Sequence, residues 1–164
     1  MRLEQLTAGH RAAVLDFETV NRDYFTGFIS DRGDEYFARF AEMYAGLLAE
    51  QDAGICRFHV LVADDGTVAG RVNLVDLVDG AAELGYRIAR AYAGQGLATD
   101  GVRQVCARAA SRYGLRRLHA VTSVANRASQ AVLRHNGFVL VGDTEIVGRP
   151  GFRFHRDLPP PPDA

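Results

Sequence analysis

The spacing of apolar residues changes from a strand-like to a helix-like pattern at a glycine-rich stretch. This change limits the folds that the chain can adopt. Over residues 55–89, three segments, "ICRFHVLVAD", "TVAGRVNLVDLV" and "AAELGYRIA", have the composition of strands and are separated by turn residues, which predicts an antiparallel meander. From Leu97 to Tyr113 apolar residues recur at three or four positions, which indicates a helix ending at Gly114. The stretch "AGQGLAT", residues 93–99, therefore joins a strand to a helix.

The remaining segments complete a mixed α/β order. We expect a strand in "RLEQL", helices in "AGHRAAVLDFETV" and from Asp34 to about Gln51, a strand in "LRRLHAVTSV", a helix from Asn126 to about Asn136, and strands in "FVLVGDTEIV" and "GFRFHRDL". The predicted order is β-α-α-β-β-β-α-β-α-β-β. Antiparallel strands in the middle and helical crossovers only later describe a single mixed sheet, which is not the doubly wound Rossmann arrangement.

Chain length and terminal composition favour one domain. A chain of 164 residues with 48% hydrophobic content is long enough for one core. We place this domain at residues 1–158, and we expect the proline-rich end, residues 159–164, to be disordered. The start "MRLEQLTAGH" lacks the apolar region of a signal peptide, and no apolar run reaches membrane-spanning length, so we expect a cytoplasmic protein without a membrane partner.

Charge and residue usage exclude several function classes. A net charge of -1 argues against a nucleic-acid partner. All 19 basic residues are arginine, so neither the P-loop lysine nor the amine of a Schiff-base enzyme is available. Cys56 and Cys106 lack metal-ligand or redox spacing, and we expect packed thiols and no metal site.

Two glycines, Gly94 and Gly96, lie at the turn between the third meander strand and the helix. Such a turn presents free amides and the positive end of a helix dipole, which together suit a phosphate. Glycines also occur in turns that bind nothing, so a structural turn and an anion cradle both remain open. The dinucleotide motif needs glycine where Thr99 stands and an acidic residue about twenty positions later, which is absent.

A second segment, "VANRASQAVLRHNGF", carries polar residues at the end of a strand and the start of a helix. Asn126 suits an N-cap, Ser129 suits a first helical turn, and Gly137 suits the position after a helix. Helix capping explains this segment locally, and contact with a ligand is the alternative.

Taken together, the two segments resemble the GNAT superfamily of acyl-CoA-dependent N-acyltransferases, and in particular its RimJ/RimL-like branch. "ELGYRIARAYAGQGLAT" is similar to the family's pyrophosphate motif R/Q-G-x-G-x-G/A, and "NRASQAVLRHNGF" is similar to N-x-x-S-x-x-x-L-x-x-x-G-F. The resemblance extends to about Leu158. It implies a single-domain α/β fold with a mostly antiparallel sheet, a splayed central strand pair and flanking helices.

The resemblance also implies acetyl-CoA as co-substrate and assigns residues to it. The amides of the turn would hold the pyrophosphate, the strand edge at Arg87 and Ile88 would pair with the pantetheine amides, and an amide near Ile88 could polarise the thioester carbonyl. Asn126 would contact the pantetheine arm, and the Ser129 hydroxyl would approach the thioester sulfur. The turn residues in this set are Gly94, Gln95, Gly96, Leu97, Ala98 and Thr99.

The chain departs from the family pattern at two positions. Ala93 stands where the pyrophosphate motif usually has arginine or glutamine, which predicts weaker coenzyme affinity. Leu133 stands where many members have a tyrosine that acts as general acid, which excludes that mechanism here and gives weight to Ser129.

The implied reaction is acetyl transfer to a primary amine by direct attack within a ternary complex, and it needs a base. Glu83 is the first candidate, with a solvated strand residue as the alternative, and His119 is the second, with a structural histidine as its alternative. The amine could belong to a protein N-terminus or to a small molecule, and a homodimer stays open. A non-catalytic acyl-CoA sensor is the alternative function.

Five residues near the N-terminus form an aromatic and basic patch. We expect this patch either to receive an anionic or peptide-like acceptor or to pack in the core. Its residues are Arg22, Tyr24, Phe25, Phe28 and Arg32.

Overall fold

The computed structural model describes residues 1–160, and the last four positions of the predicted disordered tail, 161–164, lie outside the described residues. Seven strands form one sheet in the order β1-β2-β3-β4-β5-β7-β6. The strands are β1 (Arg2–Gln5), β2 (Arg57–Val62), β3 (Val68–Val78), β4 (Ala81–Ile88), β5 (Arg117–Ser123), β6 (Val139–Ile146) and β7 (Arg149–Asp157). All neighbouring pairs are antiparallel except β4 with β5, which are parallel.

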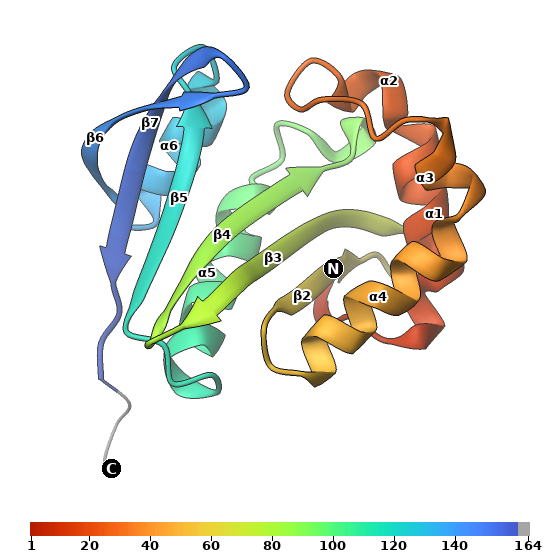
Figure 1. Ribbon diagram of the computed structural model, residues 1–164, viewed down its shortest axis with the longest axis horizontal. Coiled ribbons are helices and arrows are strands. Elements are labelled where there is room, and N and C mark those ends of the chain that lie inside the picture. The colour runs from red at the N-terminus through yellow and green to blue at the C-terminus, as the bar shows by residue number, and fades with distance from the viewer. Residues whose placement is uncertain (161–164) are drawn as a thin grey trace.

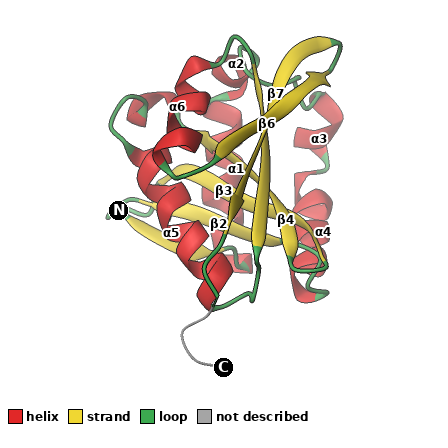
Figure 2. Ribbon diagram, turned by 90° about the vertical axis from the view of Figure 1, so that its left-hand side faces the viewer, coloured by secondary structure: helices red, strands yellow, loops and turns green. Residues whose placement is uncertain are grey.

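Helices cover both faces of the sheet (Figure 2). They are η1 (Ala8–His10), α1 (Arg11–Val20), α2 (Arg22–Phe25), α3 (Asp34–Ala38), α4 (Phe40–Asp52), η2 (Arg90–Tyr92), α5 (Leu97–Ser111) and α6 (Arg127–His135). One buried cluster, including Val72, Val105 and Leu118, packs the sheet against α5 and α6. A second, including Val14 and Tyr44, packs it against α1 and α4. Each face of the sheet is thus made rigid by its own apolar layer, and the predicted element order is confirmed.

The N-terminal helical region is more broken than its periodicity predicts. The single helix expected from Asp34 to Gln51 is interrupted at Arg39, whose backbone angles (φ -109°, ψ 25°) are not helical. The interruption separates α3 from α4 while the rings of Tyr36 and Phe40 remain packed edge to face, with centroids 5.7 Å apart. Arg39 stays bonded to both helices, because its amide donates to the Glu35 carbonyl at 2.9 Å and its carbonyl accepts the Met43 amide at 3.1 Å. Ring packing adds a side-chain contact across the break.

The centre of the sheet opens between β4 and β5. These strands pair only from Ala81 to Glu83 on β4 and from Arg117 to His119 on β5. Each strand keeps a long antiparallel partner on its other side, because β3 follows β4 to Ile88 and β7 follows β5 to Ser123. Figure 1 shows the two strands meeting at one end and diverging toward the other. The splayed central pair that the family resemblance implies is therefore confirmed.

Candidate active site

The divergence leaves one edge of β4 without a strand partner. The Gly80 carbonyl, just before β4, accepts the Arg116 amide at 2.6 Å on the β5 side, whereas the Ala89 amide donates to the Ala69 carbonyl at 2.8 Å on the β3 side. Because the amide and carbonyl of successive strand residues point to opposite edges, the even-numbered residues Leu84, Tyr86 and Ile88 direct these groups into the opening. The opening is therefore lined by free backbone donors and acceptors, the groups that pair with an extended amide chain.

The glycine turn lies at the wide end of this edge. Gly94 and Gly96 have φ values of 74° and 77°, a left-handed conformation that side chains other than glycine rarely adopt, and Gly96 caps α5. A Cβ built on either glycine would meet nothing within 4 Å, so the turn faces open space. The first amides of α5, from Leu97 to Thr99, have no acceptor within the helix. This arrangement fits the pyrophosphate of coenzyme A, because amides and the helix dipole converge on an unobstructed surface.

The N-terminus of α6 lies across the opening from β4. Asn126 caps this helix, because its Oδ1 accepts the Ser129 amide at 3.1 Å, so the capping interpretation holds for this side chain. The Ser129 Oγ lies 2.7 Å from the hydroxyl of Tyr86, and the Ser129 carbonyl lies 3.1 Å from the same hydroxyl. Burial raises the pKa of Tyr86 to about 12, although the bond to Ser129 opposes this rise. Leu133, at the position of the family's helical tyrosine, is fully buried in the core.

Tyr86 was not predicted as a site residue. The sequence carries one signal for it, because Leu84, Tyr86 and Ile88 alternate along β4 and a phenol stands among apolar side chains on the face covered by α5 and α6. What the sequence does not show is that the start of α6 comes within hydrogen-bond distance of that phenol.

The two candidate bases meet at the narrow end of the opening. Glu83 and His119 are partners in the last β4–β5 pair. Their neighbours Leu84 and Leu118 are buried toward α5 and α6, so Glu83 and His119 point to the opposite face, Glu83 half-buried and His119 exposed. From Glu83 to Ile88 an extended strand spans roughly 16 Å, so a proton path between these positions would pass through water.

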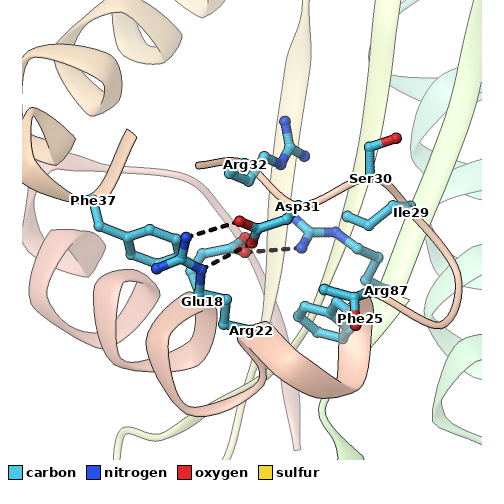
Figure 3. Close-up of a pocket in the computed structure, with 10 residues that line it drawn as sticks. Glu18, Arg22, Phe25, Ile29, Ser30, Asp31, Arg32, Phe37 and Arg87 are labelled. Atoms are coloured by element: carbon cyan, nitrogen blue, oxygen red, sulfur yellow. Dashed lines mark hydrogen bonds and ion pairs between the residues drawn. The ribbon is translucent and has the colours of Figure 1, made fainter. Parts of the chain in front are cut away.

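Arg87 has a partner that the sequence did not predict. Its side chain donates to both carboxylate oxygens of Glu18 on α1, at 2.8 and 2.6 Å (Figure 3). Arg71 donates to the same carboxylate at 2.8 Å. Burial alone would raise the pKa of Glu18, but the two guanidinium groups outweigh it and hold that pKa below its usual value. The Arg87 guanidinium also lies 4.7 Å from the centre of the Phe25 ring.

This network changes the interpretation of the β4 edge. Strand alternation turns the Arg87 backbone toward β3 and its side chain toward α1, so of the predicted pair only Ile88 presents backbone groups to the opening. Glu18 could have been found from the sequence, because it shares a helix face with Val14 and Phe17, where a carboxylate needs a buried partner.

The predicted basic patch is largely engaged in internal contacts. Arg22 donates to both oxygens of Asp31 at 2.8 Å and to Asp34 at 2.9 Å, as the close-up of the small pocket between α1 and the segment 26–33 shows for Asp31 (Figure 3). Phe25 is buried, and Phe28 is 54% exposed. The patch therefore offers an exposed ring, and the charge of Arg22 is balanced by two carboxylates.

No group of three or more histidine, cysteine, aspartate or glutamate side chains in residues 1–160 is arranged to hold a metal ion. None of the helices in this part of the chain is both long and apolar enough to cross a membrane.

Known proteins are similar to this chain in sequence or in fold. The family model described as "Acetyltransferase (GNAT) domain" matches residues 1–139. The probable N-acetyltransferase YjcK of Bacillus subtilis is 29% identical over 133 residues, which cover 76% of this chain and 72% of YjcK. A ribosomal-protein-S5-alanine acetyltransferase from Vibrio fischeri superimposes with a TM-score of 0.89 at 16% identity, over 94% of this chain and 91% of the other.

A polyamine enzyme has a similar fold. Spermidine N-acetyltransferase from Vibrio cholerae, solved with CoA and spermine, superimposes with a TM-score of 0.78 at 19% identity, over 95% of this chain and 94% of the other. The structural likeness supports the fold, and the family model, which matches most of the chain, carries the assignment. The chain belongs to the GNAT family and is an acetyl-CoA-dependent acetyltransferase.

Proposed function

We propose that the protein transfers the acetyl group of acetyl-CoA directly to a primary amine bound beside it in a ternary complex. One observation carries this proposal: the free β4 edge from Leu84 to Ile88 leads to an open glycine turn at one end and has Ser129 across from it. An extended pantetheine arm with a pyrophosphate at its end has complementary groups in the same order. Acetyl-CoA supplies the activated thioester when bound.

Most of the predicted coenzyme-binding residues receive a part in this scheme, whereas Arg87 is engaged with Glu18. The amides from Gly94 to Thr99 would receive the pyrophosphate, and the unpaired β4 edge would pair with the pantetheine amides. Because the Oδ1 of Asn126 already caps α6, only its Nδ2 group remains to reach the pantetheine arm. The Ile88 amide would stabilise the negative charge that develops on the thioester oxygen, and the Ser129 hydroxyl would donate to the sulfur.

We propose a protein N-terminal α-amine or a small-molecule amine as the acceptor. Structural neighbours are named for both classes, an alanine of ribosomal protein S5 and spermidine. The acceptor must arrive from the face of the sheet that carries Glu83 and His119, because α5 and α6 cover the other face. The positive charge of Arg22 is already paired with the carboxylates of Asp31 and Asp34. This weakens the case for an anionic acceptor and favours an acceptor recognised by its amine.

A panel assay tests this function. The purified chain is incubated with acetyl-CoA and, separately, with peptides carrying free N-termini, polyamines and simple primary amines, while release of the coenzyme thiol and acetylation of the amine are both measured. Transfer to at least one amine class, with thiol and product in equal amounts, supports the proposal. Binding of acetyl-CoA without transfer to any amine would instead support the sensor alternative, and failure to bind it would reject both.

A further inference from the structure

The Tyr86 side chain crosses the opening and joins β4 to α6. Among the described residues, its hydroxyl makes the side-chain hydrogen bonds that connect these two elements, at 2.7 Å to the Ser129 Oγ and at 3.1 Å to the Ser129 carbonyl. The opposite side of Ser129 is held as well, because its amide donates to Asn126. Ser129 is therefore fixed through its amide, its carbonyl and its hydroxyl.

The two hydroxyl groups share two protons, and their distribution decides what Ser129 can do. Tyr86 has one hydroxyl proton and two acceptors within reach, the Ser129 Oγ at 2.7 Å and the Ser129 carbonyl at 3.1 Å. If Tyr86 donates it to the nearer Ser129 Oγ, the serine proton is free to point at a third atom. If Ser129 donates to Tyr86, its own proton is used up. A phenol is a stronger hydrogen-bond donor than an alkyl hydroxyl because it is more acidic, so the first arrangement is favoured. Burial of Tyr86 raises the pKa of the phenol and so keeps its proton available in either arrangement.

We propose that Tyr86 is a positioning residue. Its hydroxyl donates a hydrogen bond to the Ser129 Oγ, so that the serine proton points into the opening, toward the sulfur of the departing coenzyme. This inference rests on the proposed function, because it assigns the geometry around Ser129 to the leaving-group side of that reaction. The role proposed for Tyr86 requires no contact with the acetyl group or with the amine.

The reaction balances without any proton leaving Tyr86. The amine nitrogen attacks the carbonyl carbon, and the carbon–sulfur bond then breaks with its electron pair remaining on sulfur. Ser129 donates a hydrogen bond to this thiolate, and the surplus proton of the nitrogen passes to a base or to water. The thiolate is better stabilised by a hydroxyl whose proton already faces it than by one that must first rotate.

A double-mutant cycle tests the pairing. We expect Tyr86→Phe to lower kcat about tenfold while the KM for acetyl-CoA changes less than about twofold, since the lost interaction acts mainly on the transition state. Ser129→Ala should lower kcat by at least as much, and the double variant should be no slower than Ser129→Ala alone. Equal effects of Tyr86→Phe with and without Ser129, or an effect on KM only, would overturn the inference.

Tyr113→Phe is a matched control. The Tyr113 hydroxyl also makes a 2.7 Å bond, to His59 Nε2, but at the C-terminal end of α5, far from the glycine turn at its start. This variant should lose comparable stability while its kcat stays at the wild-type value. A general loss of activity through destabilisation would lower both variants equally, so the comparison separates positioning from folding.

A measurement without turnover keeps this inference separate from the proposed function. Thiolate absorbance of coenzyme A bound to each variant is recorded at a fixed pH near the pKa of a free thiol. A larger ionised fraction on the wild-type chain than on Tyr86→Phe supports the inference even if no amine is acetylated, because the hydrogen bond from Ser129 favours the thiolate. An equal fraction on both rejects it, whereas amine transfer by the wild type decides the proposed function alone.

Discussion

Glu83 and His119 form the last residue pair between β4 and β5, and beyond this pair the two strands separate. Both side chains point to the face of the sheet that faces α1, because Leu84 and Leu118 occupy the other face. This geometry thus brings the two proposed bases together at the point where the opening begins. It also places them at the narrow end, away from the glycine turn.

Replacing each candidate base tests whether either one acts. We expect Glu83→Gln to lower kcat about a hundredfold, because a positioned base typically contributes that much, and His119→Gln to lower it less. His155→Gln is a control, since His155 is the β7 partner of His119 and lies one strand further from the opening. Initial rates at saturating acetyl-CoA provide the measurement. Wild-type rates in both Glu83→Gln and His119→Gln would show that solvent accepts the proton.

The glycine turn can be tested by adding one methyl group. Gly96→Ala places a Cβ on the open surface in front of α5, and we expect coenzyme A to bind at least about tenfold more weakly, because the methyl group blocks close approach of the pyrophosphate. Gly54→Ala is the matched control, since Gly54 has nearly the same φ, 76° against 77°, and equally open surroundings. Each variant should lose about 1 kcal/mol of stability from backbone strain. Calorimetric titration with coenzyme A would contradict the assignment if both variants bound alike.

Restoring the family's basic residue should strengthen coenzyme binding. Ala93 is exposed immediately before the turn. In Ala93→Arg a guanidinium should reach the pyrophosphate and tighten binding by about fivefold at low ionic strength, with the gain shrinking as salt is added. Ala91→Arg adds the same charge two residues earlier and controls for general electrostatic attraction. An equal gain in both variants would mean that position 93 has no specific contact.

The sequence predicted the fold and the position of the glycine turn between β4 and α5, and the physical reason is that the signals for both are local. Alternation along β4, the glycines of the turn and the helical spacing after Leu97 each act over a few residues. Arg87 shows where such reasoning stops. Its side chain donates hydrogen bonds to Glu18, a residue 69 positions away in the sequence, and no local pattern specifies that contact. Tyr86 and Ser129, 43 positions apart, are a second long-range pair of this kind.

The buried network around Glu18 should be needed for stability. Glu18 is 2% exposed and forms ion pairs with two guanidinium groups, Arg71 and Arg87. Glu18→Gln leaves both cations in a buried site with a neutral partner, and we expect the free energy of unfolding to fall by about 3 to 5 kcal/mol. Glu42→Gln, which breaks an exposed pair with Arg39, should cost less than about 1 kcal/mol. Urea denaturation measures both, and similar losses would contradict the assigned role of burial.

His59 should make the protein less stable as the pH falls through the mildly acidic range. The ring is fully buried, with Nδ1 3.1 Å from the Val72 carbonyl and Nε2 2.7 Å from the Tyr113 hydroxyl. The neutral ring satisfies both contacts if Nδ1 donates to the carbonyl and Nε2 accepts from the hydroxyl. Burial lowers the pKa of His59 to about 4, against an ordinary value of 6.5.

The direction of this effect follows from proton binding. Between about pH 6.5 and about pH 4 the unfolded chain binds a proton on His59 that the folded chain refuses, so the free energy of unfolding falls as the pH drops and levels off below about pH 4. The full loss is about 3 kcal/mol. Urea unfolding at about pH 7 and about pH 5 measures most of this loss in the free energy of unfolding. Both pH values lie above the range in which Glu18 takes up a proton, so Glu18 does not contribute to the difference. His59→Gln should reduce this dependence, and a variant that loses as much stability as the wild type between these two pH values would show that another group is responsible.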